Sequence, residues 1–235
     1  MGGHFATHSL DENGNWKIKV ATPAASFEKQ TITFSDGSDK NTVVGNVLIG
    51  EVWIASGQSN MSMPVVGWTN SPIHNVDSIL NSAENYADKL RFTTIPIGGS
   101  RYPQDSTKVI WQRCSKSAVE NFSAVAYFFA THLIDSLNVP VGVISCSYGG
   151  SSLETWIPTE VNESFGDIVM DNSTYNNINQ QTPSACYNAM MFPLRGYTAS
   201  GFIWYQGENN AYGDYESYCF RLCKMIESWR AAWGQ

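Results

Sequence analysis

The chain has 235 residues, of which 43% are hydrophobic and 15% charged, with a net charge of −7 and a pI near 5.0. This length and apolar content suit one α/β domain of ordinary size with some extra sequence, and they exclude a disordered or coiled-coil chain. The acidic balance argues against nucleic acid or an anionic membrane as a partner, because those surfaces select basic patches. No apolar run is long enough to cross a bilayer.

The amino terminus and the cysteines bear on localisation. The first five residues lack the charged and apolar regions of a signal peptide, which indicates a cytoplasmic chain or one whose leader has been removed. The five cysteines are odd in number and have no Cys-x-x-Cys spacing, so at least one is unpaired within the chain. We expect buried free thiols.

Residues 1–44 are predicted to form β structure joined by turns. Residues 16–20 alternate apolar and polar side chains, as a half-exposed strand does, and residues 31–34 repeat that pattern. So few strands do not make an independent domain. We therefore expect a partial β-rich accessory segment over residues 1–44 and the main domain over residues 45–235.

The strongest functional signal lies in residues 47–61. The first half is rich in Val, Ile, Leu and Trp, the composition of a strand buried on both faces of a parallel sheet. Gly57 permits a tight turn, and Gln58-Ser59-Asn60 then falls where a strand leads into a helix, the edge at which open α/β sheets bind ligands. On residue type alone, Ser59 is either a helix N-cap or a nucleophile.

Further elements alternate along the chain as in an α/β fold. Strands are predicted at residues 89–95, 141–146 and 201–205, and helices at residues 75–88, 123–137 and 212–233. Ser123 has the residue type of an N-cap. The apolar face of the helix that follows is predicted to consist of Val125, Phe128, Phe129, Leu133 and Leu137. That of the last helix is predicted to consist of Tyr215, Cys219, Leu222, Ile226, Trp229 and Trp233.

Polar segments follow these strands. Gly149 and Gly150 come directly after a strand, where glycines allow backbone to approach a ligand closely. Residues 158–183 are polar and Asn-rich, and we interpret them as an excursion that covers the sheet edge. Trp68, in the loop over residues 64–72, is either a platform for a sugar ring or a packing residue.

Three blocks of this sequence resemble the sialate O-acetylesterase and acetylxylan esterase branch of the SGNH hydrolases. The first joins Gly-Glu-Val-Trp at residues 50–53 to Ser-Gly-Gln-Ser-Asn-Met at residues 56–61. The second is the Gly-Gly-Ser-x-x-Glu-x-Trp pattern of residues 149–156, and the third is Trp-Tyr-Gln-Gly-Glu at residues 204–208. Such a resemblance implies a three-layer, flavodoxin-like α/β sandwich with a central parallel sheet, preceded by a partial β segment.

The resemblance also implies roles for individual residues. Ser59 would attack an acetyl ester, and its N–H, that of Gly149 or Gly150, and the amide of Gln206 would hold the oxyanion, with Asn209 as a reserve donor. The supporting residues would be Gln58, Asn60, Glu154 and Glu208. Glu154 is expected to support its loop by hydrogen bonding, the alternative being a salt-bridged surface glutamate.

The implied substrate is an acetylated carbohydrate, of the sialic acid or the xylan type, and no metal or organic cofactor is needed. Family habit favours a secreted or periplasmic protein. The absence of a Gly-x-Ser-x-Gly elbow around Ser59 disfavours an α/β-hydrolase lipase or peptidase.

A catalytic base is missing from the motifs. The family supplies it from an Asp-x-x-His motif after a fifth strand, and none of His4, His8, His74 and His132 has Asp three residues before it. We therefore expect an esterase truncated before that motif, with self-association through the sheet edge left exposed. The alternative is a glycan-binding pseudo-esterase, or an inactive fragment.

Overall fold

The computed structural model describes residues 6–14, 16, 18, 20–171, 173–213 and 215–234. Its contacts divide the chain into two units, Met1–Gly50 and Glu51–Gln235. The division falls slightly later than the boundary we expected from the sequence.

The first unit is built on one β-hairpin. Strand β1 (Ser26–Ser35) pairs antiparallel with β2 (Asn41–Ile49). The predicted strand over residues 31–34 is confirmed within β1. In the predicted strand over residues 16–20, the described residues Trp16, Ile18 and Val20 belong to no strand, and residues 15, 17 and 19 lie outside the described residues.

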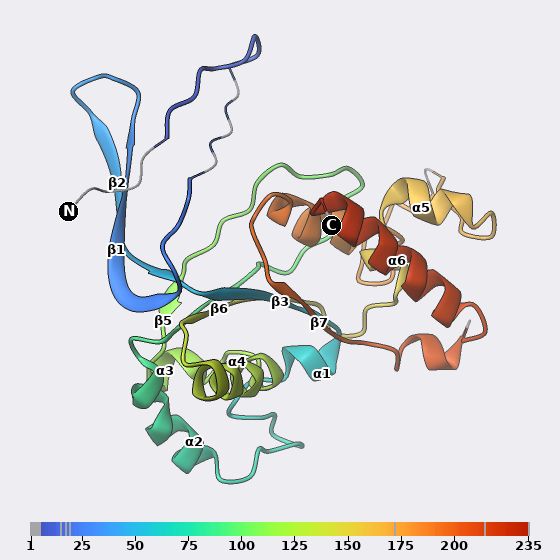
Figure 1. Ribbon diagram of the computed structural model, residues 1–235. Coiled ribbons are helices and arrows are strands. Elements are labelled where there is room, and N and C mark those ends of the chain that lie inside the picture. The colour runs from blue at the N-terminus through green and yellow to red at the C-terminus, as the bar shows by residue number, and fades with distance from the viewer. Residues whose placement is uncertain are drawn as a thin grey trace. The chain divides into compact units, whose positions relative to one another are not determined.

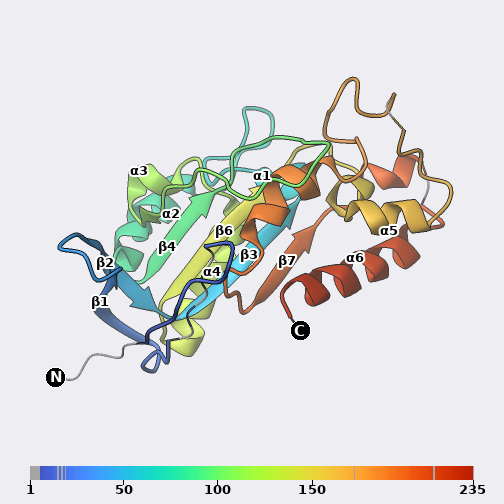
Figure 2. The same ribbon diagram turned by 90° about the horizontal axis from the view of Figure 1, so that it is seen from above.

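The second unit contains a five-stranded sheet with the order β5-β4-β6-β3-β7. Its members are β3 (Glu51–Gly57), β4 (Leu90–Thr94), β5 (Gln112–Arg113), β6 (Val141–Ser147) and β7 (Gly201–Tyr205). The short β5 is antiparallel to β4, and the other four strands are parallel. In Figure 2 their arrowheads point toward the same edge, which places the ends of β3, β6 and β7 together. The predicted strands at this sheet are therefore confirmed.

The two faces of the sheet are covered by different helices, as the alternation of side chains along the strands requires. On β3, Ile54 and Ala55 are both fully buried, yet they belong to separate hydrophobic clusters, one on each face. Val143 and Ile144 divide between the same two clusters on β6. Figure 1 shows α1 to α4 on one side of the sheet and α5 and α6 on the other, which confirms the predicted three-layer α/β sandwich.

The first helical layer packs through small residues. It contains α1 (Ser59–Ser62), α2 (Val76–Ser82), η1 (Ala83–Tyr86), α3 (Lys116–Val119) and α4 (Ala124–Leu137). Ser123 is the N-cap of α4, since its Oγ accepts a hydrogen bond from the N–H of Ala126.

The predicted apolar face of α4 is wrong at Phe128 and Leu137, which are 42% and 53% exposed. The buried residues of the helix include Ala126, Ala130 and Ile134. The small side chains of Ala126 and Ala130 let the helix approach the sheet closely, an effect that a prediction based on large apolar residues misses.

The second layer contains the remaining helices. They are η2 (Glu154–Trp156), α5 (Thr159–Ser164), the π-helical turn η3 (Tyr187–Met191), η4 (Phe192–Leu194), η5 (Asn210–Tyr212) and α6 (Tyr218–Ala232).

The last helix, α6, begins later than predicted and its buried face is rotated. Its buried residues are Arg221, Met225 and Trp229, while Cys219 and Ile226 are exposed. The prediction from apolar spacing missed this buried face because one of its residues, Arg221, is charged.

The cysteines fall into two groups. Cys114, Cys146 and Cys186 are buried free thiols, as expected, whereas Cys219 and Cys223 are exposed on α6, so the expectation is wrong for these two. Burial raises the pKa of Cys114 and of Cys186 to about 12, and it raises that of Cys146 as well. The buried thiols therefore remain protonated at neutral pH.

Because thiolates are the reactive form, we predict that a thiol reagent at pH 8 modifies Cys219 and Cys223 in the folded chain and leaves the buried three intact. Mass spectrometry of proteolytic fragments would identify the modified positions, and denatured protein is the control in which all five react. Rapid modification of Cys146 in folded protein would contradict the packing described here.

Candidate active site

Ser59 lies at the carboxyl edge of the sheet, at the first position of helix α1. The preceding residue, Gln58, is the N-cap of α1, so the N-cap interpretation of Ser59 is wrong. Its hydroxyl makes no hydrogen bond to any residue that the structure describes, and the residue is partly exposed. The local structure thus presents an unengaged hydroxyl directly after β3.

A close contact between two strand ends fixes the entry to α1. Gly57 has a φ of +143°, and a methyl group placed on it would lie 2.1 Å from the carbonyl oxygen of Tyr205, at the end of β7. The N–H of Gln58 donates to that same oxygen at 2.9 Å. Only glycine fits this position, because both the backbone angle and the space exclude a side chain.

The side chains beside Ser59 connect it to the loop after β7. Gln58 Oε1 accepts hydrogen bonds from the N–H groups of Gly207 (3.4 Å) and Asn209 (3.2 Å). Asn60 Nδ2 donates to the carboxylate of Glu208. Gln58, Asn60 and Glu208, which the sequence suggested as supporting residues, are thus brought together around Ser59.

The loop after β6 approaches Ser59 from the other side. The N–H of Tyr148 donates to Gly57 O at 3.0 Å, and that of Ser151 closes a turn onto Tyr148 O at 3.2 Å. Gly150, with a φ of +72°, takes the turn position that requires a positive angle. A methyl group on Gly149 would lie 3.8 Å from Ser59 Cβ, so this backbone lies beside the Ser59 side chain. Within the described part of the chain, the N–H groups of Gly149 and Gly150 donate to no backbone carbonyl.

Gln206 is buried and its side chain is fully engaged. Its Nε2 donates to Ser151 O at 3.0 Å and to Asn210 Oδ1 at 2.7 Å, and its Oε1 accepts from the hydroxyl of Tyr218 at 3.0 Å. Both amide protons are therefore directed into the protein. Asn209 is partly exposed, and its Oδ1 accepts from Gln181 at 3.3 Å.

A buried ion pair lies behind these loops. Arg221, 3% exposed, donates to Glu154 Oε1 at 2.9 Å, and Glu154 is 8% exposed. Asn210 Nδ2 also donates to the Glu154 carboxylate, at 3.1 and 3.3 Å, and Asn210 Oδ1 accepts from the N–H of Leu153 at 2.9 Å. Glu154 therefore supports its loop by hydrogen bonding, and the interpretation of it as a surface residue is wrong.

Sequence reasoning missed Arg221, Asn210 and Tyr218, which complete this network. One signal was present for Arg221, which stands four and eight residues before the buried Met225 and Trp229 and so shares their face of α6.

The polar excursion also reaches the site. Gln180 Nε2 lies 3.4 Å from the position that a methyl group on Gly150 would take. The neighbouring Gln181 donates to Asn209, as described above. Residues of the predicted covering segment therefore border both Gly150 and Asn209.

Other candidates lie apart from these contacts. Trp68 is 43% exposed, and its backbone hydrogen bonds run to Ser71 within its own loop. His74 and His132 are both exposed, and neither donates to Ser59. Among the described residues, no three His, Cys, Asp or Glu side chains are grouped to hold a metal ion, and no helix is long and apolar enough to span a membrane.

The fold is a three-layer α/β sandwich with a serine at the carboxyl edge of a mostly parallel sheet. Residues 49–235 match the family model described as "Carbohydrate esterase, sialic acid-specific acetylesterase". The chain belongs to this family of carbohydrate esterases.

Individual relatives agree with this assignment. The human sialate O-acetylesterase is 33% identical over 196 residues, which cover 80% of this chain and 36% of the relative. The mouse protein of the same name is 31% identical over 221 residues, with coverages of 80% and 40%. The crystal structure of a carbohydrate acetylesterase from Xanthomonas citri aligns with a TM-score of 0.78 and 31% identity, over 96% of this chain and 48% of that one. The chain thus spans less than half the length of these relatives.

The contact at Gly57 generates a prediction about stability. Gly57→Ala should lower the free energy of unfolding by at least about 3 kcal/mol, because the new methyl group meets backbone that cannot move away easily. Gly149→Ala is the matched control: its methyl group has ordinary contacts, and the change should be less than about 1 kcal/mol. Urea unfolding followed by Trp fluorescence measures both. Equal stability of the two variants would contradict the described approach of β3 to β7.

The buried ion pair generates a second prediction. Arg221→Met should destabilise the chain by about 3–5 kcal/mol, since it leaves the Glu154 carboxylate buried without its cation. Lys224→Met on the same helix is the control, because the Lys224–Glu227 pair is exposed and should contribute less than about 1 kcal/mol. The comparison uses the same urea titration. A cost for Arg221→Met as small as that of the control would show that Glu154 does not depend on Arg221.

Proposed function

We propose that this chain acts as a carbohydrate O-acetylesterase in which Ser59 is the nucleophile. The observation that supports the proposal most is that the Ser59 hydroxyl has no hydrogen-bond partner among the described residues, while the backbone of Gly149 lies beside the Ser59 side chain. In the reaction, Ser59 Oγ attacks the carbonyl carbon of an acetyl ester and the sugar oxygen leaves. Water then hydrolyses the acetyl-serine, which releases acetate.

Backbone N–H groups are the best-placed donors for the oxyanion. We assign this role to the N–H of Ser59 and to an N–H of the Gly149–Gly150 turn, because the turn lies beside the Ser59 side chain and its N–H groups donate to no described carbonyl. Asn209 is a better side-chain candidate than Gln206 in this arrangement, since both amide protons of Gln206 are used by Ser151 and Asn210. Gln206 then has a positioning role, because its hydrogen bonds to Ser151 and Asn210 hold the loop after β6 against the loop after β7.

The proposed substrate is an acetylated carbohydrate, because the chain belongs to a carbohydrate esterase family. Both sialic acid and xylan-type acetyl esters fit this proposal. We propose Trp68 as a platform for a sugar ring, because its side chain is 43% exposed.

The described residues do not supply the general base that would activate Ser59. The 235 residues contain no Asp-x-x-His sequence. Strand β7 is the last strand in the sheet order, so it has a free edge in the described part of the chain. We propose this edge as the place where a further segment, or a second copy of the chain, pairs and completes the site.

The test is hydrolysis of a chromogenic nitrophenyl acetate by the parent chain and by two serine variants. When pairing at the β7 edge supplies the base, Ser59→Ala should lower the rate by at least about 100-fold, the low end of what a positioned general base contributes. Ser117→Ala, an exposed serine on α3, should keep the parent rate. Circular dichroism of all three proteins checks that they are equally folded.

Two other outcomes distinguish the alternatives. A parent rate equal to that of folded Ser59→Ala would contradict catalysis by this chain, and it would favour the glycan-binding alternative if both proteins then bind an acetylated sugar equally well. A specific activity that rises with protein concentration would show that association of chains supplies part of the site.

A further inference from the structure

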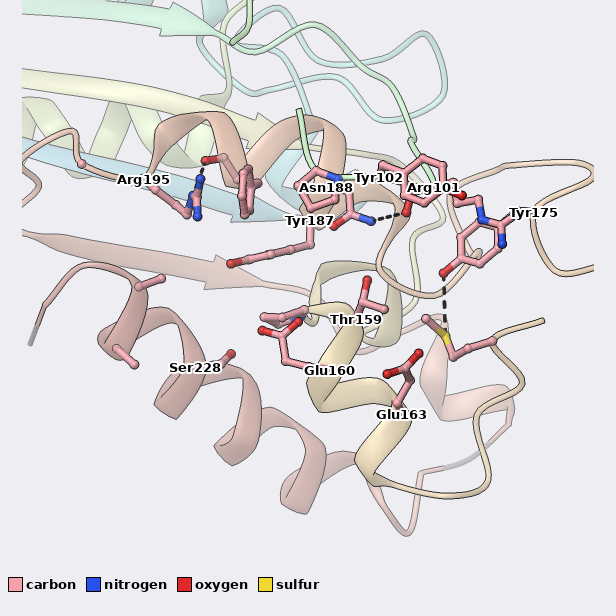
Figure 3. A pocket seen from close by; sticks show the side chains of 17 residues that line it. Arg101, Tyr102, Thr159, Glu160, Glu163, Tyr175, Tyr187, Asn188, Arg195 and Ser228 are labelled. Atoms are coloured by element: carbon pink, nitrogen blue, oxygen red, sulfur yellow. Dashed lines mark hydrogen bonds between the residues drawn. The ribbon is translucent and has the colours of Figure 1, made fainter. Parts of the chain in front are cut away.

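A second cavity lies on the face of the sheet that carries α5 and α6. Its volume is about 840 Å³, within the range of small-molecule sites, and its lining comes from α5, the carboxyl end of α6, residues 187–196 and the segment after β4. Figure 3 shows it from close by. None of its lining residues belongs to the site around Ser59.

Tyr187 presents a polar group to this cavity. The residue is 6% exposed, and its ring packs edge-on against Phe192 with the centroids 6.1 Å apart. Figure 3 shows its side chain reaching into the space between its own segment and α6. Its hydroxyl has no hydrogen-bond partner among the described residues and is not among the fully buried polar atoms, so a ligand in the cavity can reach it. Burial and the nearby Glu160 raise the pKa of Tyr187, so the hydroxyl remains a donor at neutral pH.

Two carboxylates and two guanidinium groups line the cavity together with Tyr187. Glu160 and Glu163 stand three residues apart on α5 and therefore project from one side of it, as Figure 3 shows. Arg101 and Arg195 line the opposite part of the cavity. Two positive and two negative side chains leave the cavity without a net charge, which disfavours an anionic or a cationic ligand.

The wall opposite α5 combines aromatic rings with a buried amide. The guanidinium of Arg101 lies 5.2 Å from the ring centroid of Tyr175. Asn188, 1% exposed, donates from Nδ2 to the carbonyl oxygens of Ser100 and Arg101, which fixes the segment after β4 against residues 187–191. The cavity therefore has a rigid wall on this side.

From these contacts we propose that the cavity is a second carbohydrate-binding site, which takes a neutral, hydroxyl-rich glycan. Sugar hydroxyls donate to the carboxylates of Glu160 and Glu163 and accept from the Tyr187 hydroxyl and from guanidinium N–H groups. The apolar face of a sugar ring packs on the aromatic rings. The site lies outside the Ser59 constellation, so the proposal does not depend on the esterase reaction.

The experiment is calorimetric titration of the full chain with xylohexaose, a neutral glycan, and with sialyllactose, an anionic one. Xylohexaose should bind and sialyllactose should bind more weakly. Tyr187→Phe should weaken xylohexaose binding roughly 2- to 10-fold, the effect of one hydrogen bond. Combined Glu160→Gln and Glu163→Gln substitutions should weaken it further.

Two controls separate this site from the one at Ser59. Glu227→Gln, an exposed change on α6 outside the cavity, should leave the affinity unchanged, and Ser59→Ala should do the same. Failure of xylohexaose to bind at millimolar concentration would overturn the proposal. So would an affinity that none of the cavity variants changes, or a preference for sialyllactose. If Tyr187→Phe hydrolyses the ester at the parent rate, glycan binding in the cavity and ester hydrolysis at Ser59 are independent, and each proposal can be tested without the other.

Discussion

The buried ion pair between Arg221 and Glu154 holds three distant segments of the chain together behind the candidate active site. Glu154 belongs to the loop after β6, Arg221 to α6, and Asn210, which donates to the same carboxylate, to the loop after β7. A buried ion pair contributes to stability only when the remaining hydrogen-bonding groups of both side chains are satisfied. Arg221 meets this condition through a second partner, Asp167, near the end of α5. The positions of the Gly149–Gly150 turn and of Gln206 both depend on this arrangement.

A second constraint acts from the front of the site. Gly57 allows the end of β3 to approach the carbonyl of Tyr205, and Gln58 then joins the backbone of Gly207 and Asn209. The loop after β7 is thus held by Gln58 on one side and by Glu154 on the other. This double attachment holds the backbone around Ser59 in place while the Ser59 hydroxyl and the N–H groups of Gly149 and Gly150 stay unengaged, which is a suitable arrangement for a nucleophile.

The site around Ser59 and the cavity lined by α5 and α6 have different chemistry. Around Ser59, backbone groups and amides dominate, and they suit a developing negative charge. In the cavity beneath α5, the charges of Glu160, Glu163, Arg101 and Arg195 balance, and Tyr187 supplies a hydroxyl that the protein itself does not use. A carbohydrate esterase with a second glycan site would hold a polymeric substrate while Ser59 acts on its acetyl groups.

The sequence by itself determined the four parallel strands of the sheet, the three motif blocks and the family, because runs of Val and Ile, turn glycines and short motifs are local signals. The strand predicted over residues 16–20 was wrong for the described residues of that range. The sequence did not determine the buried faces of α4 and α6. Ala126 and Ala130 are buried because small residues permit close approach to the sheet, and Arg221 is buried because Glu154, 67 residues away in sequence, neutralises it. The engagement of Gln206, the exposure of Cys219 and the unpartnered hydroxyl of Tyr187 were likewise decided by the tertiary structure. Each of these depends on contacts between residues far apart in the chain, which no local pattern encodes.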